Sequence, residues 1–226
     1  MLILENLILY NHIGKPMKIL KIIFTFLFVG ISTMANSNTN VIYSPELHAK
    51  AQAGDAVSQL ELANAYLYGN GIEEDGDIAE EWAIKAAEND NVDAMYLLGE
   101  SYSTDALLRS DFDEEGSKEG FIKAAKWYQE AVKHNHAEAM LELSDLYESG
   151  DGVPKDEKQA FLLLEKAATL GVPQAMNKLR YAYEKGTGVE TDLEKATYWN
   201  DLYEKNKVEI SREELIVSAK KDKEML

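Results

Sequence analysis

The sequence predicts an all-α fold, an α/α solenoid (superhelix) of about four helix-pair repeats with an N-terminal and a C-terminal capping helix. The main observation is self-similarity: four segments superpose when counted from Ser58, Ala94, Ala139 and Ala175. Within each segment apolar residues recur at helical spacing, and in three segments a pair of glycines separates two helical stretches. One helix pair cannot bury its apolar face alone, so we expect consecutive pairs to stack.

The N-terminus has the three-part composition of a signal peptide over residues 1–35. Lys18 and Lys21 precede an apolar run over 22–31, and Thr33 and Ala35 follow at the spacing that a signal peptidase reads. This run is shorter than the ~20 residues that span a bilayer. We therefore expect an exported protein with its true start at Met17 and a short linker over 36–43. An uncleaved N-terminal anchor is the alternative.

The composition of the chain narrows the classes of partner and chemistry. The chain has 23 Lys and Arg against 40 Asp and Glu, a formal net charge of −17. A surface this negative repels nucleic-acid phosphates and anionic lipids and favours basic partners. Because the chain has no Cys, disulfides, thiolate metal sites and a Cys nucleophile are excluded. We expect protein partners, no nucleic acid, and no stable membrane insertion after signal cleavage.

The solenoid is expected over residues 44–226 and begins with a capping helix. Ser44 is a typical N-cap residue, and Pro45 suits the first helical position. The helix should run to Ala53, ahead of Gly54.

Each repeat is expected to consist of two antiparallel helices, with repeats over about 58–93, 94–138, 139–174 and 175–206. In the first helix a Leu and a Tyr four residues apart share one face. These residues are Leu62 and Tyr66, Leu98 and Tyr102, Leu143 and Tyr147, and Leu179 and Tyr183. Because helical spacing and repetition explain the tyrosines fully, we interpret them as core residues.

A Gly-x-Gly pair and an Asp mark the boundary between the two helices in three repeats. The glycines should end the first helix and the aspartates should cap the second. The residues concerned are Gly69, Gly71 and Asp75, then Gly150, Gly152 and Asp156, then Gly186, Gly188 and Asp192. In the second helix, Ala and Trp three residues apart, such as Ala79 and Trp82, supply an inner face that allows close packing.

The second repeat contains nine extra residues between Tyr102 and Ala124 and lacks the glycine pair. The sequence leaves open whether this insertion, residues 103–120, is ordered. Asp111 to Gly116 begin like a calcium loop, but Ile122 stands where the bidentate Glu is required. We therefore expect no calcium site.

No other motif indicates catalysis or a cofactor. His134 and His136 lie at the turn after a helix without an evident third ligand, so we interpret them as loop residues. The glycine pairs end helices instead of opening them, which is the wrong context for nucleotide binding. We expect no catalytic residues, no metal and no cofactor.

The C-terminus carries a capping box, Ser211-Arg212-Glu213-Glu214, which predicts a final helix over 211–225. Leu215, Ile216 and Ala219 should face the array, with the charged residues outward.

The repeat pattern Ala-x3-Leu-x3-Tyr-x2-Gly-x-Gly-Val-x2-Asp-x3-Ala-x2-Trp-x3-Ala-Ala resembles the Sel-one-like repeat (SLR), which is related to the tetratricopeptide repeat. The resemblance covers residues 54–206 and departs from the family at the insertion, Leu163, Arg180 and Tyr203. It implies a helical scaffold for protein complexes. Bacterial members are often exported, and some contact host cells.

By analogy with tetratricopeptide arrays, the first helices should line a concave face that binds a partner. Mixed Tyr, Leu, Asn and carboxylate side chains suit a basic or amphipathic peptide. The predicted partner-binding residues are Leu60, Asn64, Leu67, Tyr68, Tyr96, Glu100, Leu141, Asp145, Glu148, Asn177, Tyr181 and Glu184, with Ser103 beside them. The alternative is that several of them only pack against the neighbouring repeat.

The leading interpretation is a periplasmic or secreted scaffold that is not an enzyme. One alternative is a secreted factor that binds a host receptor. Another is a cell-wall or β-lactam hydrolase, because some exported members of the superfamily are linked to that chemistry. Those members are rich in Cys, which this chain lacks.

Overall fold

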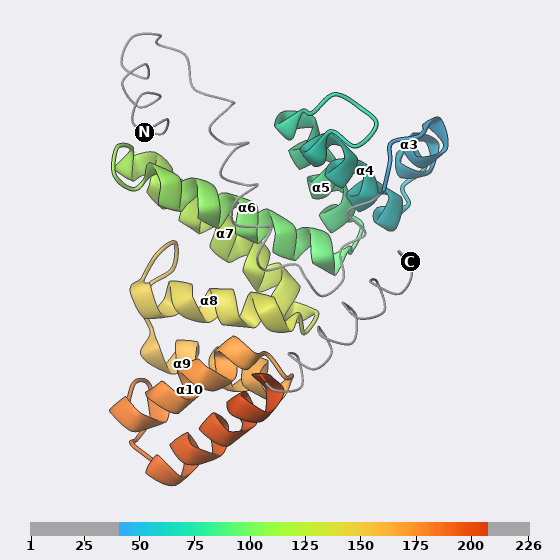
Figure 1. Ribbon diagram of the computed structural model, residues 1–226. Helices are drawn as coiled ribbons and strands as arrows, with labels where there is room; N and C mark the ends of the chain where they lie inside the picture. The colour runs from blue at the N-terminus through green and yellow to red at the C-terminus, as the bar shows by residue number, and fades with distance from the viewer. Residues whose placement is uncertain (1–40, 208–226) are drawn as a thin grey trace, which may run out of the picture. The chain divides into compact units, whose positions relative to one another are not determined.

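The computed structural model describes residues 41–207, in which every regular element is a helix (Figure 1). The predicted signal peptide, most of the linker and the predicted helix over 211–225 lie outside the described residues. The helices are α3 (Pro45–Gln52), α4 (Ala56–Tyr68), α5 (Gly76–Glu88), α6 (Val92–Arg109), α7 (Glu114–Lys133), α8 (Ala137–Ser149), α9 (Glu157–Thr169) and α10 (Pro173–Lys185). A further helical stretch occupies 193–207. None of the helices within 41–207 has the length and apolarity needed to cross a membrane.

The helices pack in chain order as pairs, which confirms the predicted all-α solenoid. α4 packs on α5, α6 on α7 and α8 on α9, and each pair also contacts the next. The first helices α6 and α8 touch each other directly. The predicted N-terminal helix is present as α3, where the Ser44 hydroxyl accepts a hydrogen bond from the Leu47 N–H at 3.0 Å, and α3 packs on α4.

The first glycine of each pair ends the first helix, as the sequence predicts. Gly69, Gly150 and Gly186 adopt left-handed conformations with φ of 64°, 91° and 76°. This conformation is readily accessible to glycine, and it turns the chain out of the helix.

The second glycine lets the loop lie against the preceding repeat. A Cβ at Gly152 would stand 2.2 Å from the Phe121 carbonyl oxygen, and one at Gly188 would stand 2.1 Å from that of Glu157. Both contacts are with the start or body of the previous second helix, so this glycine is required by packing between repeats as well as by φ.

The predicted aspartates cap the second helices. The Asp75 carboxylate accepts hydrogen bonds from the N–H groups of Asp77 and Ile78 at 3.0 and 3.1 Å. Asp156 makes the equivalent bonds, and Asp192 accepts from Lys195 N–H at 3.0 Å. The backbone N–H of each Asp donates to the carbonyl of the repeated Tyr: Asp75 to Tyr66, Asp156 to Tyr147 and Asp192 to Tyr183. The loop therefore has one geometry in three repeats.

The insertion lengthens both helices of the second repeat. α6 has 18 residues and α7 has 20, where α4 and α5 have 13 each. Residues 103–120 are thus mostly helical around a short turn. Asp113, in the loop that resembles a calcium site, caps α7 and also pairs with Arg109 at 3.2 Å.

The core consists mainly of alanines with a few large side chains. Ala86, Ala124 and Ala167 are fully buried, and Tyr128 is 1% exposed. Tyr183 is buried, while Tyr102, Tyr147 and the three tryptophans are partly buried and pack against this core. These contacts agree with the interpretation of the repeated aromatic residues as packing residues.

Candidate functional site

The predicted partner-binding residues lie on α4, α6, α8 and α10, on a surface that we call the first-helix face. Glu148 and Tyr181 are exposed. Those that are half-buried are Leu60, Asn64, Leu67, Tyr68, Tyr96, Glu100, Asp145, Asn177 and Glu184, together with Ser103. The first-helix face is therefore partly accessible along its length.

Leu141 is a correction to that set, because it is only 8% exposed and belongs to the core. Leu60 and Tyr96 occupy the same repeat position and pack partly buried against the same core. This helix position faces the following repeat, so stacking covers its side chain almost fully at Leu141 and partly at Leu60 and Tyr96.

The centre of the first-helix face lies where α6 meets α8. The Tyr96 hydroxyl donates to Glu100 Oε1 at 2.8 Å, and the Tyr96 ring stacks on His136 with centroids 4.6 Å apart. His136 caps α8, since its Nδ1 accepts the Ala139 N–H at 3.2 Å. Tyr96 is thus already held by its own chain and is half-buried.

Two half-buried carboxylates at this centre, Glu100 and Glu142, are partly shielded from water. Burial raises the pKa of Glu100, and the hydrogen bond from Tyr96 opposes the rise. Burial, reinforced by the charges of Asp145 and Glu100, raises the pKa of Glu142 to about 7, against the lowering influence of Lys178. No side chain within residues 41–207 makes an ion pair or hydrogen bond to the Glu142 carboxylate. The centre therefore holds a carboxylate, Glu142, that no cation of residues 41–207 pairs with directly.

Sequence reasoning missed Glu142, although a signal was present. Glu142 and Asp145 are three residues apart in α8 and so lie on one helix face. The negative charge of Glu100 also acts on the first repeat. The pKa of Tyr68 on α4 is raised mainly by burial and, to a smaller extent, by the charge of Glu100.

Three other predicted polar residues, Asp145, Asn177 and Glu184, are paired within the chain. Lys178 of α10 forms an ion pair with Asp145 of α8, across two repeats. Arg180 donates to Glu184 at 2.8 Å and to Asn177 at 3.1 Å. The charge on the first-helix face is therefore uneven. Glu100 on α6 and Glu142 on α8 have no ion pair within residues 41–207, whereas Asp145 and Glu184 are paired with Lys178 and Arg180.

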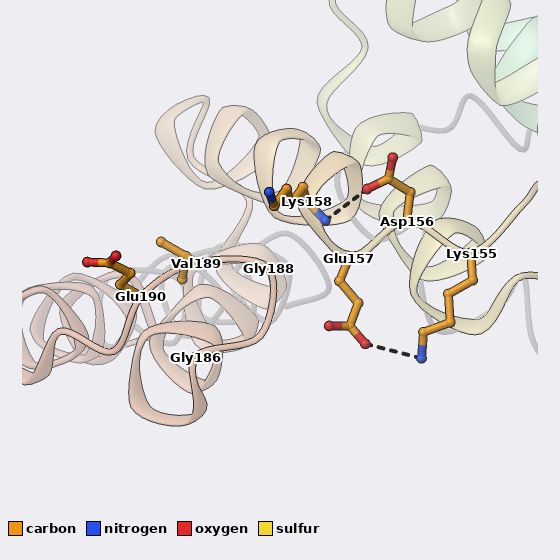
Figure 2. Close-up of a pocket in the computed structure, with 8 residues that line it drawn as sticks. All are labelled: Lys155, Asp156, Glu157, Lys158, Gly186, Gly188, Val189 and Glu190. Atoms are coloured by element: carbon orange, nitrogen blue, oxygen red, sulfur yellow. Dashed lines mark hydrogen bonds and ion pairs between the residues drawn. The ribbon is translucent and has the colours of Figure 1, made fainter.

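A hollow lies between the loops of the third and fourth repeats. This hollow of about 740 Å³ is lined by Lys155, Asp156, Glu157, Lys158, Gly186, Gly188, Val189 and Glu190 (Figure 2). Three of the charged residues there already have partners: Lys155 pairs with Glu157 at 3.2 Å, and Asp156 caps α9. Its mixed, self-paired charges favour no ligand, so the first-helix face is the better candidate.

His134 and His136 lie at the ends of helices. His134 is the exposed C-cap residue of α7, and His136 is the N-cap of α8. Within the described part of the chain no group of three or more His, Asp or Glu side chains is placed to hold a metal ion.

Comparison with known proteins places these repeats in a family. The Sel1 repeat model matches residues 56–91, 92–136, 137–172 and 173–199, well over half of the chain. Sel1 repeat proteins mediate protein–protein interactions.

Similar proteins include a chitin synthase regulator and solved structures of bacterial repeat proteins. A chitin synthase regulator of Saccharomyces cerevisiae is 33% identical over 102 residues, 45% of this chain and 13% of that protein. A protective antigen of uropathogenic Escherichia coli with an SLR fold is 29% identical with a TM-score of 0.62, covering 75% of this chain and 33% of that one. A Sel1 repeat protein from Oxalobacter formigenes is 28% identical with a TM-score of 0.59, covering 71% and 60%. The chain thus spans only part of each relative's length.

Proposed function

The chain belongs to the Sel1 repeat family, and from this premise we propose that it is an exported scaffold or adaptor, not an enzyme. It binds a basic or amphipathic segment of another protein on the first-helix face. The coarse role, interaction with proteins, is common to the family, and the finer role rests on the chemistry of this chain.

The observation that carries the proposal is the unpaired carboxylate of Glu142 beside Glu100. A carboxylate that is partly withdrawn from water and has no direct ion pair is costly in the folded state, and burial is the main reason why the pKa of Glu142 is raised. An incoming ammonium or guanidinium group relieves that cost, so binding gains free energy that a neutral ligand cannot provide. The Lys178–Asp145 pair one turn away is an example of such a contact within the chain.

Apolar and aromatic side chains on the first-helix face support an amphipathic partner. Leu67 and Tyr68 at the end of α4 and Tyr96 on α6 are half-buried, so they offer contact area that is still partly exposed to water. Tyr combines a large apolar surface with a polar tip, which suits a helix that presents one apolar and one basic side.

A peptide-binding measurement tests this proposal. A synthetic amphipathic Lys/Leu helix should bind the protein, and a Glu/Leu helix of the same length should not. The double variant Glu100→Gln, Glu142→Gln should bind the Lys/Leu helix at least about tenfold more weakly. The matched control Glu81→Gln, Glu88→Gln removes the same charge from exposed positions on α5 and should leave binding unchanged. Equal binding by both double variants would refute the basic-segment proposal.

The export and the compartment are also part of the proposal, and the sequence over residues 1–35 supports them. Fractionation of the native cell into cytoplasm, membrane, periplasm and medium tests them directly. Recovery of the full-length chain in the cytoplasm would contradict export.

A secreted factor that contacts a host is a second candidate. It is favoured by the likeness to the protective antigen of uropathogenic Escherichia coli, a description that belongs to that protein. The two candidates differ in compartment, so recovery in the medium instead of the periplasm would favour the second.

A further inference from the structure

Lys178 and Asp145 show how one first helix is tied to the next. Counted from the repeat starts Ala139 and Ala175, Asp145 is the seventh residue of the third repeat and Lys178 is the fourth residue of the fourth repeat. Their side chains form an ion pair between α8 and α10. We call two residues in these positions of successive repeats a junction pair. This junction pair is neutralised by the chain itself.

The junction pair one repeat earlier consists of two carboxylates. Glu100 is the seventh residue of the second repeat, and Glu142 is the fourth residue of the third. Glu142 thus occupies the position of Lys178, and Glu100 occupies that of Asp145. The two carboxylates act on each other, because the charge of Glu100 is one of the influences that raise the pKa of Glu142. The position that supplies an ammonium group at the next junction therefore supplies a second negative charge here.

The junction pair between the first and second repeats has no charge. It consists of Asn64 and Leu97, both half-buried. Along the first-helix face the three junction pairs are therefore uncharged, doubly negative and internally neutralised. A cation gains most at the middle one, because the other two offer either no carboxylate or a carboxylate that already has its cation.

The middle junction pair is held in place and can be reached from outside. Glu100 and Glu142 are half-buried, and neither has an ion pair within the part of the chain that the structure describes. The Tyr96 hydroxyl donates to Glu100 Oε1 at 2.8 Å, which fixes the direction of that carboxylate. One ammonium group between the two carboxylates relieves their mutual repulsion and compensates their partial loss of water.

We propose that the junction pair Glu100–Glu142 receives one lysine side chain of the bound partner, with its ammonium group paired to Glu100 as the Lys178 ammonium group is paired to Asp145. This inference rests on the proposed function and makes it more specific. The partner's cation binds at the junction of α6 and α8 instead of anywhere along the first-helix face. Glu142 determines this specificity, because a lysine at its position would close the junction from within the chain.

A charge-reversal variant tests the proposal in a binding measurement. Glu142→Lys should bind the Lys/Leu helix at least about twentyfold more weakly than the wild type does, since the chain then supplies the cation itself. The control Glu88→Lys makes the same change of charge at an exposed position on α5 and should weaken binding no more than about twofold. Equal losses in the two variants would overturn the proposal.

The same measurement separates this inference from the proposed function. If the wild type does not bind the Lys/Leu helix, the proposed function fails and the inference fails with it. If the wild type and Glu142→Lys bind the helix equally well, the cation binds elsewhere on the protein and only the inference is overturned.

Thermal unfolding above neutral pH tests the junction pair without any ligand. Glu142→Lys should raise the thermal midpoint, because an attracting pair replaces a repelling one. Glu100→Gln should raise the midpoint of the wild type but lower that of Glu142→Lys, where it removes the partner of the new ammonium group. A shift of the same sign in both backgrounds, or a lowered midpoint for Glu142→Lys itself, would overturn the proposal.

Carbodiimide crosslinking locates the bound cation, because this reagent joins an amine to a carboxylate that touches it. A Lys/Leu helix with an acetylated N-terminus offers lysine amines alone. Peptide mapping of the crosslinked complex should find these lysines joined to Glu100 or Glu142. Crosslinks that form only at other carboxylates, such as Asp145 or Glu148, would overturn the proposal.

Discussion

Gly188 in the loop of the fourth repeat lies against the backbone of Glu157 in the third, so close that a Cβ at Gly188 would stand 2.1 Å from the Glu157 carbonyl oxygen. The same relation joins Gly152 to Phe121 one repeat earlier. Two backbones in contact fix the spacing of adjacent repeats without any side chain between them. The stacking of the repeats therefore depends on Gly152 and Gly188. Within one repeat these glycines serve only the turn, but between repeats they also allow the two backbones to touch.

Gly188→Ala should destabilise the protein by more than the loss that the positive φ of Gly188 alone would cause. With φ of 70° an alanine costs about 1 kcal/mol in conformational energy, and displacement of the Glu157 backbone should at least double that loss. Chemical denaturation measures the free energy of unfolding. Gly171→Ala is the control, because Gly171 also has a positive φ, 98°, but nothing lies within 4 Å of its Cβ position. Equal losses in the two variants would show that the loop shifts freely.

Gly99→Ala should also destabilise the protein, against the usual preference of helices. An alanine in place of a helical glycine normally stabilises by up to about 1 kcal/mol. At Gly99 in α6 the new methyl group would lie 2.5 Å from the ring of buried Tyr128. Gly76→Ala in α5, where nothing lies within 4 Å, should be neutral or stabilising. Thermal unfolding of both variants distinguishes the steric effect from propensity, and a stabilised Gly99→Ala would contradict the packing described here.

Glu142→Gln should stabilise the protein above neutral pH. The pKa of Glu142 is about 7 in the folded protein and near its ordinary value of 4.5 when unfolded. The folded state therefore binds the extra proton between these values, and its stability falls as pH rises through 7. Glutamine has no charge to bury, so the variant should gain roughly 1 to 2 kcal/mol at pH 8 after allowance for solvent screening, and little at pH 4.5. Urea denaturation across this pH range checks the difference. A constant difference at all pH values would show that Glu142 titrates normally.

His136 should have the opposite pH dependence. Burial lowers its pKa, and the cap of α8 requires an unprotonated Nδ1 to accept the Ala139 N–H. As pH falls through 6.5 the unfolded chain gains a proton that the folded chain resists, so this contribution to stability is lost toward acid. His136→Asn keeps a capping side chain without a titratable group. Its stability relative to the wild type should rise as pH falls from 7.5 to 5.5. An unchanged relative stability over this range would contradict the role of the neutral imidazole.

Local features were predictable from the sequence because they depend on neighbours in the chain. Ser44, Asp75 and Asp156 cap helices where the sequence places them, and Gly69 and Gly150 end helices as predicted. Each of these features involves a side chain and a backbone group only a few residues apart. The first-helix positions could be chosen by the same periodicity, although their individual exposure could not.

The sequence by itself determined that this protein is an array of stacked helix pairs, since recurring apolar faces of that kind can be buried only against one another. Only the tertiary structure decided that Leu141 is buried, that Glu142 has no direct ion pair within residues 41–207, and that Gly188 lies against the backbone of Glu157. The physical reason is range: periodicity and caps arise within one helix, whereas burial, desolvation of a carboxylate and contact between backbones depend on how closely the next repeat approaches.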